Sequence, residues 1–200
     1  MSYPLAQLDR MLAGLVIPCY VVGVDLVAGK VRVSDGGDWT SAWVRWHALA
    51  AGKARHWRAP SMGEQGVLVS PSGEPAQGTF VPGLYGNAGA QPDNRDHVEV
   101  WRFDDGGSLV YDWAANSYTI KLPTGTVNIE VGSSKATITD DAISAKSKAI
   151  TAEAETYTAI APEILLLGNV KIDGALLVTL DILGLGKIID TAGNTANHKH

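Results

Sequence analysis

The chain has 200 residues, 46% of them hydrophobic and 18% charged, which is the composition of a folded chain and excludes disorder as the default. Its formal charge of −5, its isoelectric point near 5.5 and its dispersed basic residues argue against nucleic-acid binding. It has neither a secretion signal nor the roughly 20 consecutive apolar residues of a spanning helix, so we expect synthesis in the cytoplasm.

The first 90 residues predict a helix followed by a small barrel. Over residues 1–15, leucines recur at helical spacing behind Ser2 as the N-cap, which predicts a short amphipathic helix. Short strands separated by glycine, proline and aspartate turns are then predicted at 20–25, 30–34, 39–46, 66–70 and 78–84. Five such strands are typical of an OB-fold, which we assign to residues 16–90 and in which the single cysteine, Cys19, is expected to be buried.

Because OB-folds often bind oligonucleotides, the aromatic residues of this region have two interpretations. A stacking groove would draw on tryptophans and arginines: Trp39, Trp43, Trp46 and Trp57 with Arg45, Arg55 and Arg58. Packing in a core or a subunit interface is favoured instead, because acidic residues are interleaved throughout. His47 and His56 lack ligand-like spacing and are assigned to the core or the surface.

The composition changes after the barrel. All seven arginines lie at or before Arg102, and all six tryptophans lie at or before Trp113. Residues 91–125 predict a linking β-meander, because alternating segments at 98–103, 108–113 and 117–122 are joined by turns rich in glycine and aspartate.

Residues 126–190 alternate between apolar and polar side chains, which predicts a ladder of short strands with one apolar face. The apolar positions include Val127, Ile129, Val131, Ala136, Ile138, Ile150, Ile164 and Val170. So narrow a ribbon cannot bury this face by itself, whereas three copies wound together bury it and pair the exposed strand edges. We therefore predict an intertwined trimeric β-helix, or β-prism. A single-chain β-solenoid is the alternative, but it requires a fixed repeat that the turns do not show.

Residues 191–200 are predicted to form a metal-binding apex. On an extended backbone His198 and His200 point to the same side, while Lys199 points to the other. Two imidazoles are too few for a closed site, but a threefold assembly brings six to one axis, which suits an octahedral transition metal.

Several motifs resemble the baseplate assembly protein V family, the central spikes of contractile phage tails and of phage-tail-like bacteriocins. The resemblance is carried by residues 28–33, 43–46, 51–66 and 82–85, together with the terminal His-x-His. The most specific part is the sequence from Ala59 to Gln65, Ala-Pro-Ser-Met-Gly-Glu-Gln.

The resemblance implies an OB-fold domain seated on the baseplate hub or tail tube protein, and a homotrimeric β-helix that is pushed through the outer membrane of a target bacterium. It implies that His198 and His200 of three chains bind one iron ion near the apex. Fe(II) also agrees with six ligands, because zinc prefers four, with Ni(II) as a substitute. Family members often continue past the histidine pair, whereas this chain stops at His200, so we expect an apex without an extension.

Three rival functions are weighed against a spike. An iron enzyme with two histidines and one carboxylate would use Asp190 as the carboxylate, but six imidazoles leave no coordination position for a substrate. The other pairing of a histidine with an acid, His97 with Asp96, is assigned to a solvated loop. We expect no catalytic activity, no small-molecule substrate and no nucleic acid. A receptor-binding adhesin needs late aromatic residues, yet no tryptophan follows Trp113. A secretion-system spike shares the architecture.

Overall fold

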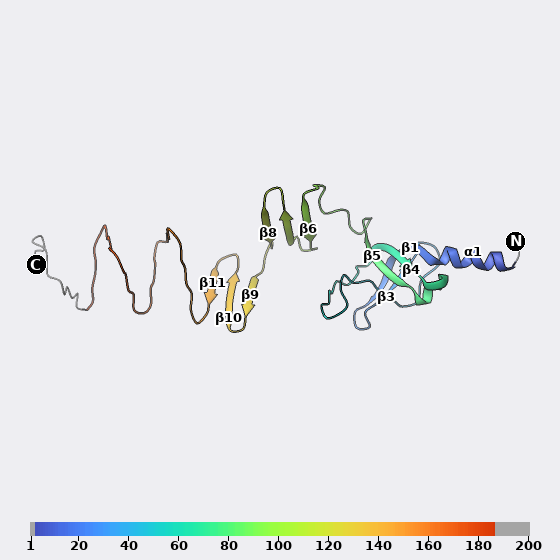
Figure 1. The fold of residues 1–200 in the computed structure, drawn as a ribbon, viewed down its shortest axis with the longest axis horizontal. Helices are drawn as coiled ribbons and strands as arrows, with labels where there is room; N and C mark the ends of the chain where they lie inside the picture. The colour runs from blue at the N-terminus through green and yellow to red at the C-terminus, as the bar shows by residue number, and fades with distance from the viewer. Residues whose placement is uncertain (1–2, 187–200) are drawn as a thin grey trace, which may run out of the picture. The chain divides into compact units, whose positions relative to one another are not determined.

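The computed structural model describes residues 3–186, and the chain divides into two units, Met1–Lys148 and Ala149–His200. The first unit begins with helix α1 (Tyr3–Leu15), and the elements that follow it are mainly strands (Figure 1). Within the described range, no helix is both long and apolar enough to cross a membrane.

A closed five-stranded barrel follows α1, which confirms the predicted barrel. Its strands are β1 (Val16–Asp25), β2 (Lys30–Ser34), β3 (Val44–Trp46), β4 (Gln65–Val69) and β5 (Thr79–Leu84). They close in the order β1-β2-β3-β5-β4, in which β3 and β5 are parallel and the other pairs are antiparallel. Two short 3-10 helices, η1 (Pro71–Gly73) and η2 (Pro75–Gln77), lie between β4 and β5.

The strand predicted over residues 39–46 is shorter in the structure. Thr40 makes only an isolated bridge with Ser34, and regular pairing begins at Val44. Ser41 explains the interruption, because its hydroxyl accepts a hydrogen bond from the Val33 amide at 3.0 Å and donates one to the Ala42 carbonyl at 2.7 Å. A side chain that binds nearby backbone groups in this way competes with the strand ladder.

The barrel interior is filled by alternating strand residues. Val21, Val31, Val33, Leu68 and Phe80 are fully buried. Close packing requires a glycine beside the aromatic ring, since a Cβ atom at Gly66 would lie 2.6 Å from the Phe80 side chain. Cys19 is buried in the same core, as predicted, and burial raises the pKa of its thiol to about 11. It therefore behaves as a small apolar residue.

The tryptophans of the barrel divide into two groups. Trp39 and Trp46 pack against the core, in agreement with the favoured interpretation. Trp43 is 43% exposed and has the Arg32 guanidinium 5.9 Å from its ring centroid, while Trp57 is 64% exposed. Trp43 and Trp57 therefore do not lie in the barrel core, and packing in a subunit interface stays a prediction for these two residues.

The segment Ala59 to Gln65, which carries the most specific motif, is held by one carboxylate. Glu64 accepts two hydrogen bonds from the Arg58 guanidinium, at 3.0 and 2.6 Å, and one from the Ser61 amide at 2.9 Å. Val21, where β1 is bulged, donates its amide to the Glu64 carbonyl and accepts from the Gly63 amide. Burial of Glu64 raises its pKa, but the hydrogen bonds from Arg58 and Ser61 and the charge of Arg58 outweigh burial and lower it.

We expect Glu64→Gln to lower the free energy of unfolding of the barrel by about 1–2 kcal/mol at neutral pH, because charge-assisted hydrogen bonds to a half-exposed arginine are lost. The folded-state pKa of Glu64 is depressed, so its contribution is present above 4.5 and is lost as the pH falls through the folded pKa. The difference from the unmodified chain should therefore shrink at low pH. Thermal unfolding followed by tryptophan fluorescence measures it, with the exposed Glu153→Gln as control; an equal deficit at pH 3 and pH 7 contradicts the assignment.

Two three-stranded meanders follow the barrel, as the alternation predicts. The first contains β6 (Val98–Arg102), β7 (Ser108–Asp112) and β8 (Ser117–Lys121). The second contains β9 (Val127–Val131), β10 (Ser134–Ile138) and β11 (Ile143–Lys146). Both sheets are antiparallel, with β7 and β10 as their central strands.

The strands predicted around Ile150, Ile164 and Val170 belong to a trimer, and the single chain does not form them. No strand is present in residues 147–186, although their side chains keep the alternating pattern. A strand forms only where a neighbouring strand accepts and donates its backbone hydrogen bonds. Within this described stretch, one chain alone supplies no such neighbour.

Candidate subunit interface

One face of the first meander is apolar and aromatic. Strand register places Glu99 opposite Tyr111 and Trp101 opposite Leu109, and the next pairing places Tyr111 opposite Tyr118. Since directly opposed residues share a face of the sheet, these side chains form one continuous surface, which we call the aromatic face (Glu99, Trp101, Leu109, Tyr111, Tyr118 and Ile120). Tyr118 is 62% exposed, so this surface is uncovered in the single chain.

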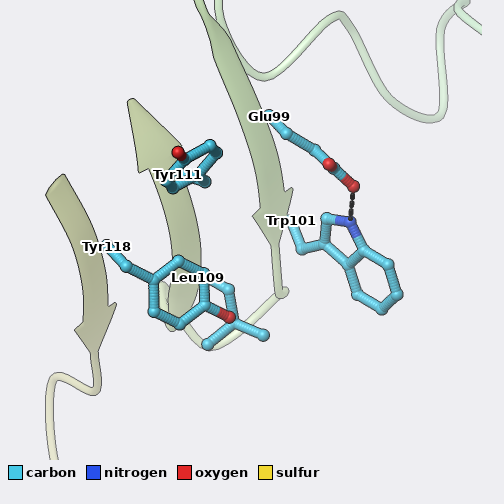
Figure 2. Close-up of a pocket in the computed structure, with 5 residues that line it drawn as sticks. All are labelled: Glu99, Trp101, Leu109, Tyr111 and Tyr118. Carbon is cyan, nitrogen blue, oxygen red and sulfur yellow. Dashed lines mark hydrogen bonds between the residues drawn. The ribbon is translucent and has the colours of Figure 1, made fainter. Parts of the chain in front are cut away.

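Figure 2 shows the five residues of the aromatic face that line a hollow of about 220 Å³: Glu99, Trp101, Leu109, Tyr111 and Tyr118. The Tyr111 and Tyr118 rings have centroids 6.4 Å apart. Trp101 donates its indole N–H to Glu99 Oε1 at 3.1 Å, which satisfies the ring's only polar group. The His56 ring centroid lies 6.2 Å from that of Trp101, in an edge-on arrangement. The hollow therefore offers mainly apolar ring surface for packing.

Sequence reasoning predicted the strands of this meander but did not identify the aromatic face. The signal was available, because large apolar side chains occur at every second position within each strand segment, at 101 and 103 and again at 109, 111 and 113. Period-two spacing puts such residues on one side of a sheet. The pairing of β7 with β8, which adds Tyr118 and Ile120, required the register.

The second meander carries a continuous apolar stripe. Register pairs Ile129 with Ala136 and Val127 with Ile138, and Ile138 is in turn paired with Ile143. The stripe comprises Val127, Ile129, Val131, Ala136, Ile138, Ile143 and Ala145, which we call the apolar stripe. Ile129 is 62% exposed and Ile143 is 82% exposed, so the apolar stripe faces solvent in one chain.

The opposite face of the second meander is polar and satisfies its own groups. Thr137 donates its hydroxyl to Asn128 Oδ1 at 3.1 Å, and Lys135 Nζ lies 2.7 Å from Glu130 Oε1. An exposed ion pair of this kind contributes at most about 1 kcal/mol. The sheet therefore has one polar face suited to contact with solvent and one apolar face that is exposed in the single chain.

Apolar side chains are also exposed along the rest of the described chain. Every residue from 138 to 186 is exposed, including isoleucines and leucines such as Ile160, at 93%, and Leu185. Contiguous exposed apolar surface on this scale marks an interaction surface, because soluble chains cover such patches.

The solvated-loop assignment of His97 agrees with the structure. His97 Nδ1 lies 3.0 Å from Asp96 Oδ1, and His97 Nε2 is 3.9 Å from Asp112 Oδ2. The hydrogen bond with His97 lowers the pKa of the fully exposed Asp96. Arg95 links the preceding loop to β7 through Asp93 and Asp112, and its hydrogen bonds hold the pKa of Asp93 well below its usual range. These groups position the loop and enclose no site.

The predicted metal ligands, His198 and His200, lie outside the described residues, as does Asp190. Within residues 3–186, no group of three or more histidine, cysteine, aspartate or glutamate side chains is placed to hold a metal ion. His47 and His56 both line an open hollow of about 430 Å³ beside the barrel, together with Arg58 and Trp101.

These features define a mainly β chain in which an OB-fold is followed by a ribbon with an uncovered apolar surface. Each of the two parts matches a known protein family. Residues 17–85 match the family described as the type VI secretion system/phage-baseplate injector OB domain. Residues 99–184 match the family described as the Gp138 beta helical trimerization domain. Together the two matches confirm the resemblance to the phage baseplate spike family that was found in the sequence.

Among individual proteins, the chain is similar to the protein named "Spike protein" of Escherichia phage P2. The two are 33% identical over 134 residues, which cover 66% of this chain and 62% of that relative. The match to the trimerization domain begins within β6, so both the aromatic face and the apolar stripe fall inside it.

Proposed function

We propose that three copies of this chain form the central spike of a contractile tail. The observation that carries the proposal is that residues 138–184 expose all their apolar side chains in a single chain, inside a region that matches a trimerization domain. Winding three chains together covers this surface and supplies each ribbon with neighbouring strands.

In this proposal the barrel attaches the spike to the baseplate hub or tail tube. The match of residues 17–85 to a baseplate injector OB domain supports the attachment. The role is mechanical and not catalytic: contraction of the sheath drives the spike through the outer membrane of a target bacterium. Interlocked strands suit this load, because many backbone hydrogen bonds must break together before the spike bends.

We further propose that His198 and His200 of the three chains hold one Fe(II) ion. Six neutral imidazoles match the octahedral preference of a transition metal, and zinc, which prefers four ligands, fits them less well. The ion would link the three chains at this position. Support for this site comes from the His-x-His spacing in the sequence.

Membrane passage is tested with intact contractile particles and sealed outer-membrane vesicles. A membrane-impermeant, amine-reactive label reaches exposed lysines such as Lys135 before contraction. After contraction on vesicles, the chain should be protected from the label, and detergent should restore labelling. Particles contracted without vesicles are the control. Equal labelling of the chain with and without vesicles would refute membrane passage.

The second candidate is the spike of a type VI secretion system, because the description of the OB-domain family covers both machines. The similarity to a phage spike protein favours the tail. Isolation of the assembled particle separates them, since a free tail sediments without a cell envelope and a secretion apparatus stays attached to one.

A further inference from the structure

The N-terminal helix carries a second uncovered apolar surface. In α1, Leu5 is 59% exposed, Leu8 is 57% exposed and Leu12 is 61% exposed, and no residue of the helix is buried. Leu15 completes the row and is 36% exposed. We call these four residues the leucine seam. It lies outside both matched domains, which begin at residues 17 and 99.

A different side of α1 is already anchored to the barrel. Gly14 and Gly73 approach so closely that a Cβ atom on either would strike the backbone of the other segment, at Gly73 or at Met11. The Ser70 amide also donates to the Leu15 carbonyl at 2.9 Å. The helix is therefore fixed at its C-terminal end through η1, while the leucine seam stays free.

The spacing of the seam identifies the kind of partner. The leucines are separated by three, four and three residues, which is the a and d pattern of a helix that packs lengthwise on other helices. In this register Gln7 and Arg10 fall on the outside, and the flanking positions hold Asp9 and Met11. In a parallel arrangement, Asp9 of one helix therefore meets no acidic residue of its neighbour within the described helix, and charge repulsion does not oppose the contact.

We propose that the three copies of α1 in the trimer pack through the leucine seam into a short parallel three-helix bundle. This inference rests on the proposed trimer, because two heptads are too short to associate without help. The trimerization domain supplies that help: it tethers the three helices in one particle and raises their effective concentration to the millimolar range, roughly. The bundle is a second clamp on the trimer, placed before the barrel in the chain.

The test uses cysteine crosslinking of the full chain with the shortest bis-maleimide. Leu8→Cys places a thiol in the seam, and Arg10→Cys places one on the outside of the same turn as the matched control. The unmodified chain is the blank, since its only cysteine, Cys19, is buried. We expect one covalent pair of chains in each Leu8→Cys trimer, and single chains in the control and the blank.

The mass of each sample, measured before crosslinking, separates the two proposals. A trimer in which Leu8→Cys gives no more covalent pairs than Arg10→Cys overturns the bundle and leaves the spike intact. Crosslinking of Leu8→Cys to an added hub protein in place of a second copy of the chain also overturns it, because the seam then contacts the hub. A mass of one chain for the unmodified protein overturns both proposals.

Discussion

Replacing Ile129 and Ile138 together by aspartate should convert the trimer into single chains. Both side chains lie on the apolar stripe, inside the region that matches the trimerization domain. In the trimer each new carboxylate would be buried without a partner, at a cost of several kcal/mol, and there would be six of them. Each lost isoleucine also removes about 1.5–3 kcal/mol of apolar burial. Light scattering should therefore report the mass of one chain.

The matched control adds the same charge to the opposite face. Asn128→Asp with Ser144→Asp introduces two carboxylates per chain on the polar side of the same sheet, where water solvates them. This variant should keep the mass of the unmodified protein. Dissociation of both variants would mean that total charge, and not the face, controls assembly; persistence of the trimer in the isoleucine variant would show that the stripe is not the interface.

Replacing His198 and His200 together by alanine should abolish iron binding. Metal analysis of the unmodified protein should give about one iron per three chains, and the double variant should give none. The trimer should persist, because its apolar surface is unchanged. Imidazole binds metal only when neutral, so acid should also release the iron from the unmodified trimer.

Lys199→Ala is the control for the iron site, since it removes a positive charge between the two histidines and leaves both imidazoles in place. It should retain the full metal content. Iron that remains in the histidine double variant would place the ligands elsewhere in the chain. Zinc in place of iron, at one ion per three chains, would contradict the assignment of the metal as iron.

The barrel was predictable because the residues of each strand and of its flanking turns are enough to determine where the strand lies. Val31 and Val33 alternate with charged residues, and the glycine and aspartate turns on either side fix where the strand begins and ends. Where a side chain competed with the backbone, prediction failed: the Ser41 hydroxyl takes the Val33 amide and shortens β3. The β-propensity of the individual residues does not indicate that such a hydrogen bond will form in the folded chain.

For the residues after the barrel, the sequence predicted which side chains share a face, but it did not predict which strands pair with each other. The alternation at Ile129 and Ile138 correctly gave one apolar face, because period-two spacing and a short turn determine the register of β9 with β10. The same alternation around Ile150 gave no strand in the single chain, since strands there depend on neighbours that one copy does not contain. The aromatic face was missed because Tyr118 joins it only through the pairing with Tyr111.

The oligomeric state of the unmodified chain tests the account most directly. All the proposed features, from the leucine seam to the iron site, require three copies. Light scattering coupled to gel filtration should give a single species at three times the chain mass of 21.1 kDa, stable on dilution. A monodisperse species at 21.1 kDa, or a dimer, would contradict the account.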